Sequence, residues 1–246
     1  DRHNEALLYK LFGVGAELLI DHAWGWEPCT IAEIKAYKPG ANSLGSGQVL
    51  QHPYAFEKAK LIVREMTDLL VLDLVDKGLV TNQMALTVGY DVENLSNPEI
   101  RKAYHGDITT DYYGRNVPKH AHGSANLSRQ TSSTKLIMDA VMELFDRIVD
   151  TNLLVRRINI TANNVVDEST AAKAVTFEQL DLFTDYDVLQ KERAKEEAEL
   201  ERERRTQKAM LSIKKKYGKN AILKGMNLQE GATTVERNKQ IGGHKA

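Results

Sequence analysis

Cysteine is nearly absent from this 246-residue sequence, in which Cys29 is the one such residue. A disulfide framework is therefore excluded, and a reducing compartment is expected. Long apolar runs are missing too: no stretch reaches the length of a membrane span, and the first residues lack a signal-peptide pattern. The sequence thus predicts a cytoplasmic protein with no membrane partner.

An excess of charge of either sign is also lacking. With 33 basic and 34 acidic residues the net charge is −1, so any surface for nucleic acid must be local. The hydrophobic fraction of 42% suffices for a core, and the length allows one medium domain with extensions. The first residue is Asp1 rather than Met, which indicates a fragment or a processed product.

Hydrophobic periodicity is best defined between residues 43 and 167. It predicts strand, helix, strand, strand, helix, strand, with strands over 43–50, 84–90, 120–128 and 157–163 and helices over 53–77 and 134–148. The fold class is therefore α+β, with a four-stranded sheet and two helices on one face. Residues 92–118 are polar and typical of loops.

The two ends of the chain differ from this central region. Residues 1–38 have a helical pattern that ends at Pro39-Gly40. Residues 190–217 are dominated by Lys, Glu and Arg, which predicts a solvated helix or a partly disordered arm. The segment after Gly218 has too few apolar residues to form a core of its own.

One face of the predicted sheet is polar and nearly uncharged. It carries Gln83, Thr87, His120, His122, Ser124, Asn126, Ser128, Arg157, Asn159, Thr161 and Asn163. Such a face can lie against a sugar–phosphate backbone, with charge from Lys119, Arg129, Arg156 and Arg157. The hydroxyl-rich helix start at residues 131–133 adds free N–H groups that can hold a phosphate. The alternative is a plain solvated face, as many antiparallel sheets have.

Two other functions would use such a face differently. An RNA-recognition module has the same element order, but it stacks bases on aromatic side chains of its central strands, where this sequence has His, Ser, Asn and Thr. His120 and His122 share a strand face, but no Cys or carboxylate is spaced to complete a metal site. We therefore assign no metal ligand and no catalytic residue.

A short apolar motif lies between the last predicted strand and the charged arm. Its residues are Gln179, Leu180, Asp181, Leu182 and Phe183. If the Leu and Phe side chains are exposed, they require a partner that buries them. The alternative is that they cap the core of the domain itself.

This motif is similar to the bacterial sliding-clamp-binding motif, Gln-Leu-x-Leu-Phe, at every defining position. The whole chain resembles the Y-family (translesion) DNA polymerases, in the UmuC-like branch of Gram-positive bacteria. Four stretches carry the resemblance: residues 11–18 (LFGVGAEL), 43–48 (SLGSGQ), 129–134 (RQTSST) and 213–220 (IKKKYGKN).

The resemblance implies four parts: 1–38 as the helical end of the thumb, 39–175 as the little-finger DNA-binding domain, 176–189 as a sliding-clamp docking segment, and 190–246 as a charged helix and flexible tail. It implies damaged-DNA binding within DNA repair and SOS lesion bypass, with primer–template duplex and the bacterial sliding clamp (beta clamp) as partners. The expected DNA-binding residues are Ser46, Gln48, Lys119, His120, His122, Ser128, Arg129, Thr131, Ser132, Arg156 and Arg157. The expected clamp-binding residues are 179–183.

The chain departs from the family in one large respect. The palm and fingers precede the thumb in that family, and the catalytic carboxylates of the palm bind two Mg²⁺ ions. Asp68, Asp73 and Asp76 lie instead on a long amphipathic helix, where surface charge is the expected role. The chain alone is thus expected to be inactive as a nucleotidyltransferase and to hold no cofactor, with Mg²⁺ confined to the missing palm. The rival hypothesis is a non-catalytic structural or regulatory module whose charged arm binds a protein.

Overall fold

The computed structural model describes residues 5–27, 29–37, 42–171, 186–241 and 244–245. Contacts divide the chain into two units, Asp1–Ala41 and Asn42–Ala246. The finer division of residues 39–246 stays a prediction. Within the described ranges no helix is both long and apolar enough to cross a membrane.

The N-terminal unit consists of short helices. These are α1 (Glu5–Phe12), α2 (Gly15–Ala23) and α3 (Ile31–Ala36). Gly13 lies between α1 and α2 with a φ of 55°, a left-handed conformation that glycine adopts without strain. Among the described apolar residues of this unit Ala16 is the one that is fully buried, whereas Trp24 and Trp26 are exposed. These helices therefore do not form a core of their own.

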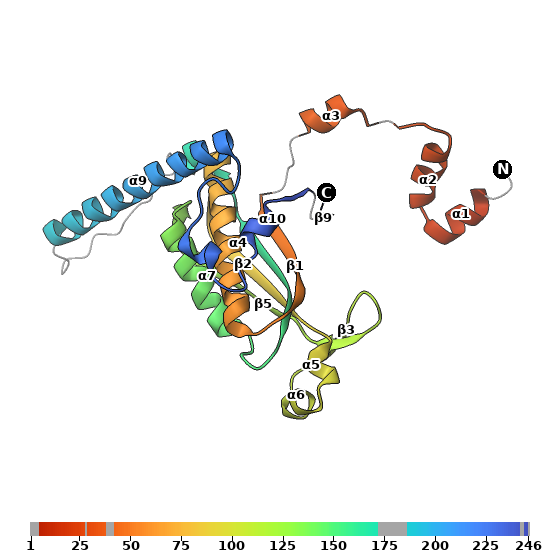
Figure 1. The fold of residues 1–246 in the computed structure, drawn as a ribbon. Coiled ribbons are helices and arrows are strands. Elements are labelled where there is room, and N and C mark those ends of the chain that lie inside the picture. Colours follow the sequence, from red (N-terminus) through yellow and green to blue (C-terminus); the bar gives the residue numbers. More distant parts are fainter. Residues whose placement is uncertain (1–4, 28, 38–41, 172–185, 242–243, 246) are drawn as a thin grey trace. The chain divides into compact units, whose positions relative to one another are not determined.

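The second unit is built on an antiparallel sheet (Figure 1). Its long strands are β1 (Leu44–Tyr54), β2 (Leu79–Tyr90), β5 (Ala121–Thr131) and β6 (Val155–Asn163), in the spatial order β1-β6-β2-β5. The predicted number of four strands is wrong. The two-residue β7 (Val166–Asp167) pairs with the start of β2 and makes a fifth, after Asn164 reverses the chain at a φ of 51°. Two residues are too few to show an alternating pattern.

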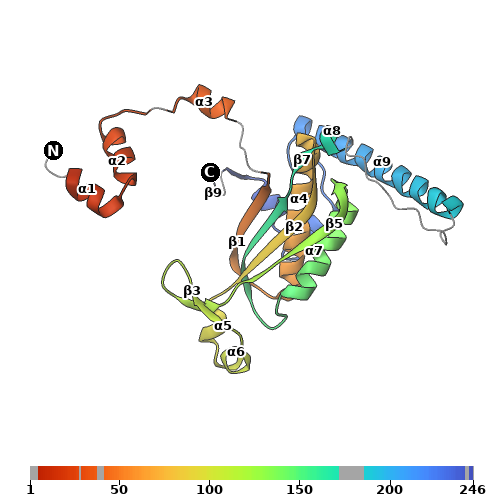
Figure 2. The same cartoon turned by 180° about the vertical axis from the view of Figure 1, so that it is seen from behind.

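Two helices cover the same face of this sheet (Figures 1 and 2). They are α4 (Phe56–Lys77) and α7 (Thr134–Ile148). The predicted start of the first helix at Pro53 is wrong, because β1 continues through Pro53 to Tyr54. Gly78 ends α4 at a φ of 66°, and Ser133 caps α7 by accepting the N–H of Leu136 at 3.3 Å.

The core lies between the sheet and these helices. Side chains alternate along β2, where Met84 and Leu86 are fully buried. Gly123 of β5 allows α7 to lie close, because a Cβ atom there would be 3.0 Å from Leu144 and 3.1 Å from Ile148. Every second strand residue therefore points away from the helices, toward the other face of the sheet.

An insertion separates β2 from β5, where the sequence predicted a loop. It contains α5 (Glu93–Ser96), α6 (Pro98–Ala103) and the hairpin of β3 (Ile108–Thr110) and β4 (Asn116–Pro118). The buried Asn94 holds the insertion to the end of the sheet. Its amide donates to the carbonyl oxygens of Asp91 and Leu154, both at 2.9 Å, and accepts the N–H of Leu154 at 2.8 Å.

The predicted charged helix is present as α9 (Tyr186–Tyr217). It is followed by a 3-10 turn η2 (Gly225–Leu228), α10 (Thr234–Arg237), β8 (Gln240–Ile241) and β9 (His244–Lys245). Residues 190–199 of α9 are exposed, as expected for a solvated helix. Gln207 is buried instead, and its amide donates to the Ser132 carbonyl at 3.0 Å and to Thr134 Oγ1 at 2.9 Å.

The C-terminal segment, residues 218–240, contacts α4. The Glu65 carboxylate is 1% exposed and accepts Asn227 Nδ2 at 2.8 Å and the N–H of Thr233 at 2.7 Å. Asp68 is 5% exposed and pairs with Lys224. The expectation that Asp68 is a surface charge is therefore wrong, because this segment covers it.

Sequence spacing explains this second contact surface of α4. Leu61, Glu65, Asp68 and Leu72 are all buried and are spaced four, three and four residues apart. With about 3.6 residues per turn they form one stripe, on the side of the helix opposite the core residue Met66. Helix α4 is thus enclosed by the sheet on one side and by the C-terminal segment on the other.

Replacing Glu65 with Ala should lower the free energy of unfolding by about 1–3 kcal/mol, because buried amide and backbone donors lose their acceptor. It should also increase hydrogen exchange in residues 218–240. Urea unfolding and exchange mass spectrometry measure the two effects. Glu143→Ala, at an exposed position of α7, is the control and should change stability by less than about 0.5 kcal/mol. Equal behaviour of the two variants would contradict a structural role for Glu65.

Candidate nucleic-acid interface

The open face is the side of the sheet that α4 and α7 leave uncovered. Its paired residues are Gly45, Gly47 and Val49 of β1, Gln83, Ala85, Thr87 and Gly89 of β2, His122, Ser124 and Asn126 of β5, and Arg157, Asn159, Thr161 and Asn163 of β6. Every residue expected on this face lies on it, except Ser128 and His120, which fall outside the paired positions. Arg157 is the one Lys or Arg in this set, which contains no carboxylate.

Hydrogen bonds between strands order the polar side chains of the open face. Gln83 Nε2 donates to Asn126 Oδ1 at 2.8 Å, and Asn163 Nδ2 donates to Gln83 Oε1 at 3.1 Å. Three amides from three strands thus form one chain of hydrogen bonds. Thr87 Oγ1 lies 2.8 Å from His122 Nδ1. These cross-strand pairs hold the side chains in defined positions.

Glycine residues keep the open face shallow along β1. A Cβ atom on Gly47 would lie 2.4 Å from Asn159 Oδ1, and one on Gly45 would lie 3.2 Å from Thr161 Oγ1. The side chains of Asn159 and Thr161 therefore lie close over the β1 backbone, in space that a larger residue would occupy. A shallow surface of this kind permits a close approach by an extended polymer backbone.

Ser46 and Gln48 do not lie on the open face. They pair with Ile160 and Ile158, which are buried on the helix-covered side of the sheet. Arg237 of α10 donates to Ser46 Oγ at 3.2 Å and to Gln48 Oε1 at 2.7 Å, and burial lowers the pKa of this guanidinium. The apolar pattern of β1 is too irregular to assign its two faces from sequence.

The start of α7, predicted to hold a phosphate, is occupied by carboxylates of α9. Ser133 Oγ donates to Glu203 Oε2 at 2.6 Å, and the N–H of Lys135 donates to Glu203 Oε1 at 3.1 Å. Arg129 pairs with Glu196 at 2.5 Å. A helix N-terminus favours carboxylate and phosphate for the same reason, because its N–H groups are unpaired donors.

Thr131 and Ser132 belong to the same turn but are engaged within the protein. Thr131 is buried, and its Oγ1 accepts the N–H of Ser133 at 3.0 Å. The carbonyl of Ser132 accepts the Gln207 amide at 3.0 Å. The exposed Ser128 precedes this turn in β5. The structure therefore gathers these residues with Arg129 at one end of the sheet.

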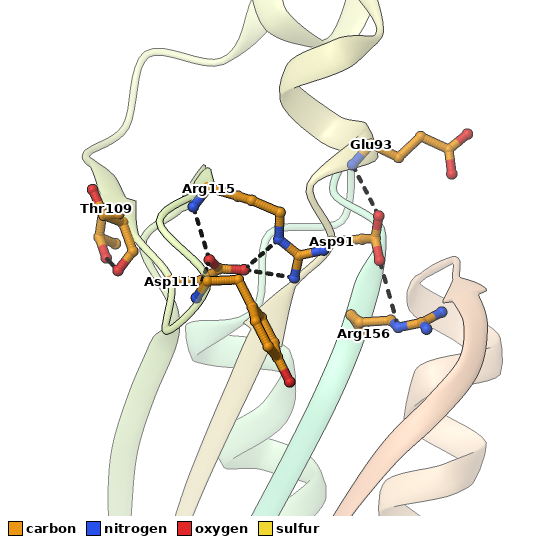
Figure 3. Close-up of polar contacts among 8 residues, drawn as sticks. Asp91, Glu93, Thr109, Asp111, Arg115 and Arg156 are labelled. Carbon is orange, nitrogen blue, oxygen red and sulfur yellow. Dashed lines mark hydrogen bonds and ion pairs between the residues drawn. The ribbon is translucent and has the colours of Figure 1, made fainter.

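The opposite end of the sheet carries a second group of charges (Figure 3). Arg156 donates to the Gln51 carbonyl at 2.9 Å, and its Nε lies 3.7 Å from the Asp91 carboxylate. Lys119 precedes β5 and pairs with Asp107 at 2.8 Å, a hydrogen bond that raises the pKa of the lysine. Both basic residues thus have acidic neighbours.

The predicted clamp-binding residues, 179–183, lie outside the described residues. Among the residues that are described, no three His, Cys, Asp or Glu side chains are placed to hold a metal ion. Sequence reasoning missed Glu196 and Glu203, although their seven-residue spacing already places them on one face of a helix. It could not show which surface this face meets.

Comparison with known proteins identifies the family. Residues 41–182 match the C-terminal domain of the impB/mucB/samB family. This chain therefore belongs to the impB/mucB/samB family, as the resemblance to the UmuC-like Y-family polymerases predicts.

One curated relative and several solved structures are similar to the chain. UvrX of Bacillus subtilis (strain 168), described as a UV-damage repair protein, is 26% identical over 242 residues, which are 98% of this chain and 47% of UvrX. The chain thus spans about half the length of this relative. A post-insertion binary complex of Dbh DNA polymerase is 13% identical with a TM-score of 0.31, covering 67% of this chain and 40% of that one. A Y-family polymerase chimera of Dbh and Dpo4 is 12% identical with a TM-score of 0.33, covering 67% and 39%.

Proposed function

We propose that this chain is the DNA-gripping and clamp-docking part of a translesion DNA polymerase that acts in DNA repair, including SOS lesion bypass. The open face carries the proposal, because Arg157 is the one Lys, Arg, Asp or Glu among its paired residues and its other polar side chains are amides, hydroxyls and an imidazole that can form hydrogen bonds. Membership of the impB/mucB/samB family and the description of UvrX as a UV-damage repair protein support a role in DNA repair.

The chemistry of the open face suits a sugar–phosphate backbone better than base edges. Phosphate contacts need cationic or N–H and O–H donors and are disturbed by carboxylates, which are absent from the paired positions of this face. Arg157 supplies charge, while Asn159 and His122 supply hydrogen-bonding groups. The shallow β1 edge leaves room for the duplex. Binding of this kind holds DNA without reading its sequence.

The N-terminal unit fits the end of a thumb domain. Its exposed apolar residues include Leu11, Phe12, Leu18 and Trp24. A surface of this composition requires apolar contacts with another part of the protein. We propose the remainder of the thumb as that partner, within a whole protein whose palm supplies the Mg²⁺ site and the nucleotidyl transfer.

Helix α9 limits access to one end of the interface. Glu196 pairs with Arg129, and Glu203 accepts the Ser133 hydroxyl and the N–H of Lys135 at the start of α7, which are groups that a phosphate would use. A phosphate at this end must displace these carboxylates. The exposed residues 190–199 remain the part of the arm that the rival hypothesis assigns to a protein partner.

The 246-residue chain should bind primer–template duplex without sequence preference and lose affinity as salt rises. In Arg157→Ala the slope of log K against log salt should decrease by about 1, because one phosphate contact is lost. Fluorescence anisotropy at several salt concentrations measures both. Arg205→Ala is the control, since this arginine is exposed and pairs within α9. Salt-independent binding, or a strong preference for one sequence, would contradict backbone contact.

The double variant Glu196→Gln/Glu203→Gln should bind the same duplex more tightly than the unaltered chain, because donors at residues 129–135 become available to phosphate. The control is Glu197→Gln/Glu201→Gln, which removes the same charge from exposed positions of α9. Anisotropy titrations compare the two at equal salt. If both variants gain the same affinity, the gain comes from the loss of negative charge alone, and the carboxylates of α9 do not compete with phosphate for these donors.

Residues 179–183 should bind the bacterial sliding clamp. Burial of Leu182 and Phe183 contributes about 1.5–3 kcal/mol each, and ordering the peptide offsets part of this. We expect an affinity in the micromolar range, about −8 kcal/mol. Leu182→Ala/Phe183→Ala should remove most clamp binding in calorimetry while DNA affinity and unfolding are unchanged. If this variant unfolds at a lower temperature yet still binds the clamp, both side chains belong to the core of the domain instead.

A further inference from the structure

The hairpin of β3 and β4 presents two tyrosines at its tip. Tyr112 is 96% exposed and Tyr113 is 76% exposed, and their ring centroids are 5.4 Å apart in an edge-on arrangement. Among the side chains described within residues 42–246, Tyr217, at 67%, is the other exposed Tyr, Trp or Phe. An adjacent pair of exposed rings is unlike the single exposed apolar residues of an ordinary surface.

Asp111 holds the tip in a defined conformation (Figure 3). Its Oδ1 accepts the N–H groups of Tyr113 and Arg115, each at 2.9 Å, and its Oδ2 accepts the Arg115 guanidinium at 2.6 and 2.8 Å. Gly114 closes the turn at a φ of 78°. A turn constrained in this way positions Tyr112 and Tyr113 before a partner arrives, which reduces the entropy lost on binding.

The chemistry of the tip matches that of a nucleobase. The Arg115 guanidinium lies over the Tyr113 ring, 5.0 Å from its centroid. Aromatic rings and guanidinium planes are the groups on which proteins stack unpaired bases. Thr110 and Asn116, the strand pair next to the tip, are both polar, unlike the apolar residues that surround aromatic side chains in the core of a protein interface.

The tip is connected to the open face through the end of the sheet. Asp91 follows β2 and lies between Arg115 and Arg156 in Figure 3. Arg156 is the neighbour in β6 of Arg157, which lies on the open face. The open face has no Tyr, Trp or Phe among its paired residues, and its His122 ring is engaged with Thr87 Oγ1 at 2.8 Å. The tip supplies the large exposed rings that the face lacks.

We propose that the hairpin tip, Tyr112, Tyr113 and Arg115, stacks on an unpaired DNA base next to the duplex that lies on the open face. The proposal rests on the proposed DNA contact of that face. It assigns the sheet to the duplex backbone and the hairpin to the single-stranded part of a primer–template.

The test compares the 246-residue chain with Tyr112→Ala/Tyr113→Ala on a duplex with a single-stranded overhang and on the same duplex with blunt ends. The double variant should bind the overhang substrate about tenfold more weakly, within the range for loss of aromatic stacking, and should bind the blunt duplex unchanged. A 2-aminopurine in the overhang should change its fluorescence on binding the unaltered chain, and this change should be lost in the variant.

Two control variants test whether the effect comes from the rings of Tyr112 and Tyr113. Tyr112→Phe/Tyr113→Phe keeps both rings and should keep the preference for the overhang substrate. If the preference came instead from hydrogen bonds between the tyrosine hydroxyls and phosphate, this variant would lose it. Tyr217→Ala removes an exposed tyrosine that also lies beside a cation, Lys216 at 5.2 Å, and should change neither affinity. Circular dichroism confirms that each variant is folded.

The outcomes separate this inference from the proposed function. Equal loss on blunt and overhang substrates, or no loss on either, overturns stacking while leaving the DNA contact of the open face intact. If the unaltered chain binds neither substrate, the proposed function and the inference both fail. If DNA binding is unchanged but the double alanine variant loses self-association in sedimentation velocity, the occupant of the tip is a second copy of this chain, and the proposal is wrong.

Discussion

The enclosure of α4 on both of its sides is the constraint on which the rest of the second unit depends. Ile62 and Met66 are buried on the side that packs on the sheet, while Leu61 and Glu65 are buried on the opposite side, which the C-terminal segment contacts. A buried carboxylate is stable only when donors satisfy it, and backbone and amide groups of residues 227–234 do so. Helix α4, near the start of this unit, therefore packs against both the sheet and the segment near the end of the chain.

This arrangement decides which surfaces are available for binding. Because α4 and α7 occupy one face of the sheet, the alternate side chains of the strands form a second face that is polar. The C-terminal segment reaches as far as β1, where Arg237 contacts Ser46 and Gln48 on the covered side. Helix α9 places Glu203 at the start of α7. Of the two faces of the sheet, the open face is thus the one that these segments leave uncovered.

Much of the fold and part of the site could be predicted from local pattern. The alternation of Met84 and Leu86 indicated a half-buried strand, and Gly78 indicated the end of α4. Alternation along β5 and β6 likewise predicted that His122 and Arg157 lie on the open face. The strand β7 and the β3–β4 hairpin were missed, because elements of two or three residues have no periodicity to detect. The aromatic tip of that hairpin was missed with them.

The sequence by itself determined the elements that a repeating pattern encodes: the long strands, the two helices, the polar character of alternate positions and membership of the family. Only the tertiary structure decided which side of β1 carries Ser46 and Gln48 and which partner buries Glu65. The physical reason is that periodicity describes one element alone. Burial and pairing also depend on segments far away in the sequence, such as Glu203 at the start of α7 and Thr233 beside Glu65. A local pattern cannot predict that such segments come into contact.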